Sequence, residues 1–281
     1  MPASQPTLHD VINFWTENPL FNDEINSTPG TKEWFEQLDA IQVNDVYLDH
    51  IDFFIPHLNP SQNLLDVGCG PGFWTRQLTK RNLNYTGVDL SAHAVELAKK
   101  GQQIYGYNGE LQVGNAEELP FADSSFDYIH SIGVIHHTPN TQKCIDEFFR
   151  VLKPGGSGIC GVYYKNVILR NSILLTCALG LMKLFSLGLS GRGRESMSSA
   201  ATPEDLVRLY DGAANPVGKA YSKAELVQMF QKFKLEGTQL FYFPARALKI
   251  KLPKWLHSRL SFYLGLMIAI KFSKPLKSQN L

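Results

Sequence analysis

The stretch "LLDVGCGPGFW" at residues 64–74 decides the fold of this chain. Its apolar residues end in an acid, Asp66, and predict a short buried strand. Three glycines follow at every second position, namely Gly68, Gly70 and Gly72. Glycine lets the backbone turn sharply and approach a ligand closely, and a helix beginning near Pro71 would direct its free amide groups at that ligand. We therefore expect a ligand-binding loop between a strand and a helix.

Strand-like and helix-like segments alternate around this loop. Strands are expected at 63–68, 84–90, within 110–121, within 125–137 and at 156–164, and helices at 72–81, 91–106 and 140–153. This alternation predicts an α/β fold with a parallel, doubly wound sheet and helices on both faces. Such a sheet binds its ligand at the carboxyl ends of the strands, near the switch point. Residues 234–244 are expected to close the sheet as one or two antiparallel strands.

Three parts are expected along the chain. They are an N-terminal helical cap at 1–60, an α/β domain at 61–245 and a basic C-terminal extension without acids at 246–281. An apolar insertion at 163–200 interrupts the alternation inside the domain and ends in a loop-like run. Helices are expected to begin after Thr202 and Ser222, whose side chains can cap a helix N-terminus.

The composition excludes several functional classes. With 281 residues and a formal net charge of +1, the chain is long enough for a large α/β domain and lacks the charge of a dedicated nucleic-acid binder. Its four cysteines have no metal-type spacing and are expected to be reduced core thiols. The N-terminus does not have a signal-peptide pattern, and the apolar runs 171–182 and 260–270 are shorter than the ~20 residues that span a bilayer. A cytoplasmic protein is the expectation.

The glycine spacing indicates the kind of ligand. A dinucleotide fold would have G-x-G-x-x-G, whereas this chain has G-x-G-x-G with neither lysine nor arginine in the loop. That pattern suits a ligand with an amino-acid end and no phosphates. Asp89 ends the second strand, where a carboxylate can accept hydrogen bonds from ribose hydroxyls, and Asn115 is placed to contact an adenine edge.

With these motifs in order, the chain resembles the class I S-adenosylmethionine-dependent methyltransferases over about residues 60–165. The flanking segments "FWTENP", "GTKEWF" and "ANPVGKAYSKAELVQMF" resemble a bacterial small-molecule group of that superfamily. The resemblance implies a Rossmann-like, seven-stranded sheet with one antiparallel strand, and methyl transfer by in-line displacement. It implies that S-adenosylmethionine is held by Asp66, Gly68, Cys69, Gly70, Gly72, Asp89, Leu90, Asn115, Ala116, Ser131 and Gly133.

Two departures from the family pattern narrow the expected substrate. Many relatives have an aspartate where this chain has Asn115, whose amide oxygen can still accept from the adenine amino group. The Asn-Pro-Pro-Tyr motif of amino-directed nucleic-acid enzymes is replaced by "SIGVIHHTPN" at 131–140. We therefore expect a small-molecule acceptor and no nucleic acid, and the spacing supports no metal site.

Candidate catalytic and substrate residues lie beside the expected cofactor. His136 and His137 follow the fourth strand, and either could accept a proton or orient the nucleophile, with His136 slightly favoured. The alternative is that both histidines only order the turn. Trp15, Tyr163, Tyr164 and Tyr221 are candidates for the substrate pocket, with a core role as the alternative for each.

The insertion and the basic extension bear on the acceptor. The insertion is either a buried lid helix or a lipophilic channel or membrane-contacting surface, and the acid-free extension favours contact with a membrane a little. We expect a methyltransferase for a small, lipophilic acceptor, with O-, N- and C-methylation left open. The alternatives are a catalytically silent scaffold that binds S-adenosylmethionine and a nucleic-acid methyltransferase.

Overall fold

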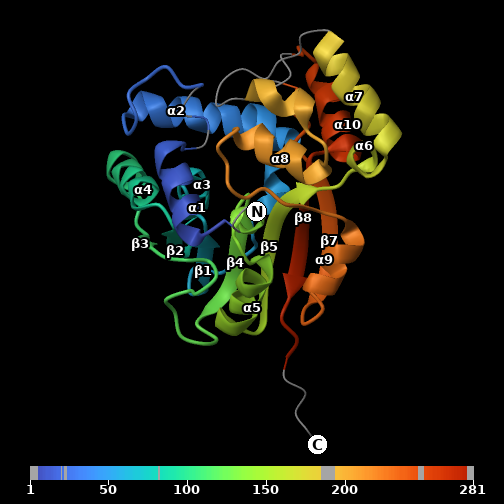
Figure 1. Cartoon of the computed structure of the whole chain (residues 1–281). Helices are drawn as coiled ribbons and strands as arrows, with labels where there is room; N and C mark the ends of the chain where they lie inside the picture. The colour runs from blue at the N-terminus through green and yellow to red at the C-terminus, as the bar shows by residue number, and fades with distance from the viewer. Residues whose placement is uncertain are drawn as a thin grey trace, which may run out of the picture.

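The computed structural model describes residues 6–19, 21, 24–81, 83–184, 194–245 and 250–276. An eight-stranded sheet runs through the molecule, with helices on both faces (Figure 1). Its strands are β1 (Asn63–Val67), β2 (Asn84–Asp89), β3 (Glu110–Val113), β4 (Phe126–Ile132), β5 (Leu152–Tyr164), β6 (Ala220–Tyr221), β7 (Lys234–Phe241) and β8 (Met267–Ser273). The mixed α/β architecture with a mostly parallel sheet confirms the expected fold class.

The strand order places a switch point in the middle of the sheet. Neighbouring strands follow the order β3-β2-β1-β4-β5-β8-β7, and the two-residue β6 pairs with the end of β5. The strands from β1 to β5 pair in parallel, with Val67 opposite Val88 and Leu65 opposite Ile129. The chain therefore leaves β1 toward β2 on one side and returns as β4 on the other, so the carboxyl ends of these strands diverge around a crevice.

The antiparallel strand is β8, which lies between β5 and β7 and pairs antiparallel with both. Residues 267–273 form this strand, although the sequence was interpreted as a separate extension from residue 246 onward. Five of its seven residues are at least nine-tenths buried, which is typical of a strand covered on both faces. The segment 234–244 does supply β7, but β7 is the edge strand and runs in the same direction as β5.

The helices follow the expected segments closely. They are α1 (Leu8–Glu17), α2 (Lys32–Ile41), η1 (Gln42–Tyr47), η2 (Leu48–Phe54), α3 (Phe73–Thr79), α4 (Ala92–Tyr105), η3 (Ile135–His137), α5 (Thr141–Val151), α6 (Val167–Arg170), α7 (Ser172–Leu184), η4 (Arg194–Ser199), α8 (Pro203–Asp211), α9 (Lys223–Met229) and α10 (Lys254–Leu264). Thr202 and Ser222 cap α8 and α9 with their side chains, as the sequence predicts.

Two hydrophobic layers sandwich the sheet, because successive strand residues point to opposite faces. Leu64 and Tyr128 pack with the N-terminal helices, whereas their neighbours Leu65 and Ile129 pack with α5 and α9. Three of the four cysteines are buried in the fold, but Cys177 on α7 is exposed, so the expectation of a core thiol is wrong there.

A buried cation links the N-terminal helix α2 to the domain, in addition to the shared hydrophobic core. Arg76 on α3 is fully buried and forms an ion pair with Asp39 of α2. Its Nη1 also donates to the carbonyl of Pro71 at 3.0 Å, and its guanidinium lies 4.7 Å from the centre of the Phe35 ring. The same side chain therefore fixes α2 and supports the glycine loop. Trp34 and Phe35 are fully buried core residues.

The apolar insertion contributes α6, α7 and η4, which lie at one end of the molecule with α10 (Figure 1). Of its expected loop-like run at 188–200, residues 188–193 lie outside the described residues and residues 194–199 form the short helix η4. The basic residues Arg246, Lys249 and Lys277 of the C-terminal segment also lie outside the described residues. In the part of the chain that the structure describes, each helix is too short or too polar to cross a bilayer.

Candidate functional site

A cavity opens at the switch point, over the carboxyl ends of β1, β2 and β4. Of the residues expected to hold a cofactor, those on its wall are Gly68, Cys69, Gly70, Asp89, Leu90, Asn115, Ala116 and Gly133. Of the other candidates, Trp15, His136, His137 and Tyr163 also line it. Segments far apart in the sequence thus meet at the switch point of the sheet, where such a fold binds its ligand.

The glycine loop has the conformation that the sequence predicts. Gly68, Gly70 and Gly72 all have positive φ, at +79°, +52° and +87°. A Cβ on Gly68 would lie 2.1 Å from a methyl group of Val134, so this position has no room for a side chain. A Cβ on Gly70 would have nothing within 4 Å, because this glycine faces the open cavity.

Asp89 fixes the loop from the end of β2. Its Oδ2 accepts from the backbone N–H of Gly70 at 2.8 Å, and its Oδ1 accepts from that of Ser91 at 2.9 Å. Burial raises the pKa of this carboxyl, while the two backbone N–H groups lower it in part. Each carboxylate oxygen keeps a second acceptor site. Asp89 can therefore hold the loop and still accept from ligand hydroxyls.

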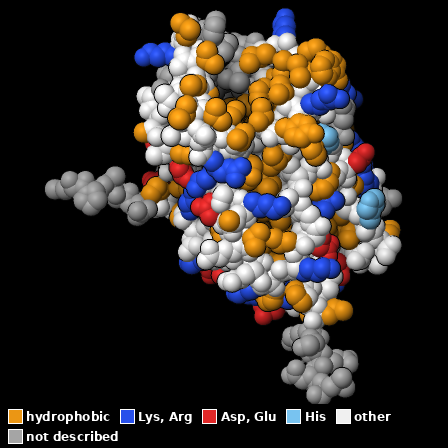
Figure 2. Space-filling model, turned by 90° about the vertical axis from the view of Figure 1, so that its right-hand side faces the viewer, with side chains coloured by type: hydrophobic (Ala, Val, Ile, Leu, Met, Phe, Trp, Pro, Cys, Tyr) orange, Lys and Arg blue, Asp and Glu red, His pale blue; other side chains and the backbone are white. Residues whose placement is uncertain are grey.

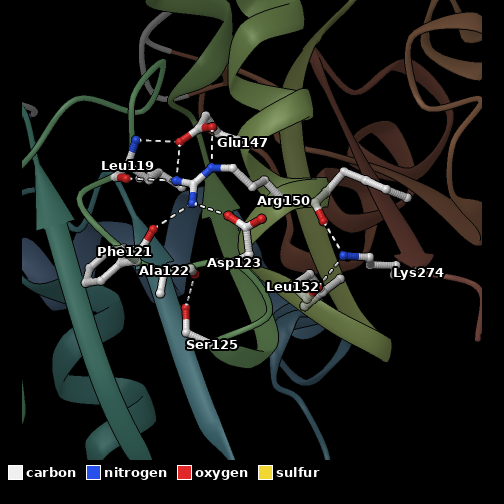
Figure 3. A network of polar contacts seen from close by, with 10 residues as sticks. Leu119, Phe121, Ala122, Asp123, Ser125, Glu147, Arg150, Leu152 and Lys274 are labelled. Carbon is white, nitrogen blue, oxygen red and sulfur yellow. Dashed lines mark hydrogen bonds and ion pairs between the residues drawn. The ribbon is translucent and has the colours of Figure 1, made fainter.

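The loop that carries Asn115 and Ala116 is anchored by Arg150 on α5 (Figure 3). The guanidinium donates to the carbonyls of Leu119 and Phe121 at 2.9 and 2.6 Å, and to the carboxylates of Asp123 and Glu147. Glu147 in turn accepts from the N–H of Leu119 at 2.7 Å. Asp123 thus joins this network as an ion-pair partner of Arg150.

Three residues expected to hold the cofactor lie behind the cavity wall. Asp66 is 1% exposed and accepts from the hydroxyl of Tyr85 at 2.7 Å, with His130 Nδ1 at 3.1 Å. Ser131 is buried and donates to the carbonyl of Val67 at 3.1 Å. Gly72 is the N-cap of α3 and packs near Ala98. In this geometry these residues support the loop and strand ends.

Both candidate catalytic histidines are buried against the cavity. His137 Nδ1 lies 2.8 Å from the carbonyl of Val217, and its Nε2 lies 3.5 Å from Oδ2 of Asp211 at the end of α8. Asp211 also accepts from the hydroxyl of Tyr163 at 2.9 Å. The ring of His136 is tilted by 52° against that of His137, with ring centres 4.1 Å apart. Among the described residues, the buried Nδ1 of His136 has no hydrogen-bond partner.

The two imidazoles differ in their surroundings: His136 is buried beside other basic groups, and His137 contacts a carbonyl oxygen. Burial, reinforced by His137 and Lys219, holds the pKa of His136 well below its ordinary value, so His136 is neutral. Because a carbonyl oxygen accepts only from N–H, His137 carries a hydrogen on Nδ1. In the tautomer with this hydrogen, the lone pair of Nε2 lies beside the carboxylate of Asp211. This pairing can accept a proton and stabilise the resulting imidazolium.

The far end of the cavity is aromatic and apolar. It is lined by Phe21, Leu38, Val46, Tyr47, Phe73, Trp74, Tyr210, Tyr242 and Met267. Trp15 on α1 covers the cavity beside the histidines, with its ring centre 4.9 Å from that of His137. Tyr164 and Tyr221 do not line it: Tyr164 is a core residue, and the Tyr221 hydroxyl donates to Thr141 Oγ1 at 2.8 Å.

Sequence reasoning missed Asp211, Tyr210, Tyr242 and Met267. Asp211 was visible only as the last residue of an amphipathic helix, without a motif around it. Met267 lies in β8, a segment interpreted as an extension. The pairing of β8 with β5 brings it to the cavity wall, opposite Tyr163. A side chain whose role depends on such a distant pairing leaves no local signal in the sequence.

The fold and the strand-end site together define a class I S-adenosylmethionine-dependent methyltransferase domain. Residues 65–160 match the family described as Methyltransferase domain, so this part of the chain is similar to that family. The match runs from within β1 to within β5 and includes the glycine loop, Asp89, Asn115 and both histidines.

Curated relatives match the chain over part of their length. A ubiquinone/menaquinone biosynthesis C-methyltransferase of Rickettsia prowazekii is 30% identical over 157 residues, which cover 53% of this chain and 62% of that protein. A 2-methyl-6-phytyl-1,4-hydroquinone methyltransferase of Oryza sativa is 34% identical over 164 residues, which cover 55% of this chain and 44% of that protein. The chain thus spans about half the length of these relatives.

Solved structures share the fold over nearly the whole chain. The (4+2) cyclase SpnF aligns with a TM-score of 0.60 at 17% identity, covering 97% of this chain and 98% of its own. At that identity the likeness shows the fold alone. The alignment includes the N-terminal and C-terminal segments that the family match leaves out.

Proposed function

We propose that the chain is a methyltransferase that uses S-adenosylmethionine to methylate a small, lipophilic acceptor. The observation that carries this proposal is one continuous cavity with two unlike ends. One end has the glycine loop, Asp89 and Asn115, and the other is lined by aromatic and aliphatic side chains. A polar cofactor and an apolar acceptor can therefore meet in the same enclosed space.

The residues present fit S-adenosylmethionine. The open side of Gly70 leaves space for the methionine part, and Asp89 offers acceptors to the ribose hydroxyls. Asn115 and Ala116 border the adenine end, with Leu90 beside them on the wall. When bound, the cofactor supplies an electrophilic methyl group on a sulfonium. The protein's own contribution is to orient the acceptor in line with that group and to exclude water.

The proton that the acceptor loses goes to the histidine–aspartate pair in this proposal. His137 accepts it at Nε2, and Asp211 stabilises the imidazolium at 3.5 Å. Tyr163 holds the other oxygen of Asp211 in place. His136, kept neutral by burial, lines the cavity beside His137 and would contact the acceptor there. This assignment favours His137 over His136 as the base.

The relatives support a lipophilic acceptor of the kind that their names describe. Two of them are methyltransferases of quinone or hydroquinone compounds, and such acceptors suit the aromatic end of the cavity. A lipophilic acceptor is met at a lipid surface, so peripheral membrane contact belongs to the same proposal. Methylation at oxygen, nitrogen or carbon is decided by where the acceptor presents its nucleophile to the bound cofactor.

Calorimetric titration with S-adenosylmethionine tests the proposal first. Wild-type protein should bind it saturably, and Asp89→Ala should lose at least about 100-fold in affinity, because the loop loses its anchor and the ribose its acceptor. Asp146→Ala removes a surface carboxylate paired with Lys232 and serves as the matched control. Folded wild-type protein that does not bind would contradict the enzyme and the scaffold alike.

Turnover separates the enzyme from the silent scaffold. Incubation with S-adenosylmethionine and a panel of hydroquinones, phenols and sterols should yield a product heavier by one methylene group, detected by mass spectrometry. Binding of the cofactor without methylation of any acceptor would favour the scaffold. Fragmentation of the product would assign the methyl group to oxygen or carbon.

A further inference from the structure

Most of the large, exposed hydrophobic side chains that the structure describes lie on the helices α6, α7 and α10. Among the described residues, eight of the twelve large hydrophobic side chains that are exposed belong to α6, α7 and α10. They are Val167, Ile173, Leu174, Leu181, Leu184, Trp255, Phe262 and Tyr263. We call the surface formed by these eight side chains the α7/α10 face. Apolar side chains gathered in this way mark an interaction surface.

The α7 helix is apolar on its outer side as well as its inner side. Leu175 is 8% exposed and packs into the main hydrophobic core, whereas Ile173 and Leu184 are 72% and 74% exposed. Burial in the fold therefore explains only one side of this helix. A buried lid helix and a membrane-contacting surface were both open expectations for this insertion, and α7 has features of both.

The charged side chains that α6, α7 and α10 themselves carry have one sign. The segments 166–184 and 250–276 contain no Asp or Glu. Arg170, Lys183, Lys254 and Arg259 are exposed there. Figure 2 shows hydrophobic side chains gathered over the upper part of this side of the molecule, with Lys and Arg side chains among them and at their rim. Exposed basic side chains on helices that carry no acids attract an anionic partner.

We propose that the α7/α10 face docks on an anionic lipid bilayer. A helix with apolar side chains flanked by lysine and arginine lies in the interfacial plane of a membrane, and tryptophan and tyrosine are enriched at that level. Trp255 and Tyr263 occupy this position on α10, at 63% and 69% exposure. With 13 residues, α7 is too short to span a bilayer and suits a surface position.

Docking there would bring the lipid surface to the apolar end of the cavity. Leu169 and Leu175 of α6 and α7 belong to the same core cluster as Tyr242 and Met267, which line the cavity. The acceptor could then pass from the bilayer to the aromatic end without crossing water. This consequence rests on the proposed function, whereas the docking itself does not require methyl transfer.

Vesicle flotation tests the docking. We expect wild-type protein to float with vesicles of phosphatidylcholine and phosphatidylglycerol, more weakly with phosphatidylcholine alone, and less at high salt. The triple variant Ile173→Gln, Leu184→Gln, Trp255→Gln should lose at least about tenfold in partitioning, because it removes inserted apolar surface. The matched control is Ile104→Gln, Val113→Gln, Val227→Gln, with exposed side chains of α4, β3 and α9.

The exposed Cys177 provides a second, local readout. The other three cysteines are buried, so a thiol-reactive, environment-sensitive fluorophore would label α7 selectively. Its emission should shift to the blue on adding anionic vesicles. An unchanged emission, or equal flotation of the wild-type protein and the α7/α10 triple variant, would overturn the proposal.

A second copy of the chain is the competing occupant of this face. If wild-type protein sediments as a dimer, ignores vesicles and becomes a monomer in the triple variant, the membrane proposal is overturned. Calorimetry with S-adenosylmethionine on the same preparations keeps the two proposals apart. A protein that binds the cofactor but not vesicles would refute the docking and the proposed membrane contact, and would leave the proposed methyl transfer to a lipophilic acceptor intact.

Discussion

The glycine-loop end of the cavity and its aromatic end differ in what forms their walls. At the loop end, the wall is formed by backbone groups and by residues at strand ends. Gly68 and Gly70 turn the chain, and Asp89 accepts from the N–H of Gly70. At the aromatic end, the wall is made of side chains. Tyr47, Tyr210 and Met267 come from η1, α8 and β8, which are more than 50 residues apart in sequence.

This difference explains why one end is recognisable in the sequence and the other is not. A backbone conformation with positive φ demands glycine at a fixed spacing, so the loop leaves a local pattern. An aromatic wall accepts many combinations of large side chains, provided that together they fill the space. We therefore expect changes at the loop end to act sharply, and changes at the aromatic end to shift acceptor preference by degrees.

The largest effect is expected from Gly68→Ala. A Cβ there would lie 2.1 Å from Val134, and alanine would also have to adopt a φ of +79°. We expect stability to fall by about 3 kcal/mol and cofactor binding to become undetectable. Urea unfolding and calorimetry would measure both. Gly106→Ala, at φ +68° with nothing within 4 Å, should cost only about 1 kcal/mol and isolates the conformational part.

Gly70→Ala separates space for the ligand from stability. Its Cβ would meet no protein atom and would project into the cavity. Stability should fall by only about 1 kcal/mol, while the affinity for S-adenosylmethionine should fall by at least about tenfold. An unchanged affinity would show that the cofactor does not lie against this loop. It would also contradict the expectation that changes at the loop end act more sharply than changes at the aromatic end.

At the other end, Asp211→Asn tests the proton acceptor. Because asparagine cannot stabilise the imidazolium of His137, turnover should fall by about 100-fold while cofactor affinity stays the same. The pH–rate profile should also shift. The groups facing His137 are Asp211, His136 and Tyr163, with Lys219 acting electrostatically on His136.

The same substitution at Asp146, a surface carboxylate on α5, provides the control for this measurement. Equal rates and equal pH profiles for wild-type protein and Asp211→Asn would assign Asp211 a purely structural role. The base would then have to be sought elsewhere at the aromatic end.

A smaller effect is expected from Arg150→Leu, which releases the loop that carries Asn115 (Figure 3). The carbonyls of Leu119 and Phe121 lose a charged donor, so stability should fall by about 1–3 kcal/mol. The affinity for S-adenosylmethionine should fall by about tenfold, because the adenine wall is no longer fixed. Lys143→Leu, an exposed site on the same helix, should change neither in calorimetry nor in urea unfolding.

The smallest effect concerns pH. Burial holds the pKa of His136 well below its ordinary 6.5, so the unfolded chain binds a proton there before the folded protein does. Stability is therefore fully present above about pH 6.5 and is lost as pH falls, by up to about 1.4 kcal/mol per pH unit for this group. His136→Leu should flatten that part of the curve in urea unfolding between about pH 7.5 and 5.5. An identical slope in the two proteins would contradict the buried, neutral assignment.

The sheet and the loop end were predictable because their signals are local. Periodic apolar residues give β1 to β5, cap residues such as Thr202 give the helices, and glycine spacing gives the loop. The position of β8 was not predictable from the segment itself. Its continuous apolar run also suits a helix, and only its pairing with both β5 and β7 makes it a strand of the sheet. The partnership of His137 with Asp211 depends on a contact 74 residues apart in the numbering and was missed for the same reason.

The place of β8 also dictates an order of assembly during synthesis. The strand β7 touches the rest of the sheet through β8, which is made later and pairs with β5 on its other side. On the ribosome, β1 to β5 can pair as they emerge, but β7 has to wait until residue 273 has left the exit tunnel. Until then the edge of β5 along residues 157–163 is open to other strands. Chaperone binding to nascent chains should therefore persist until β8 has emerged, and end soon afterwards.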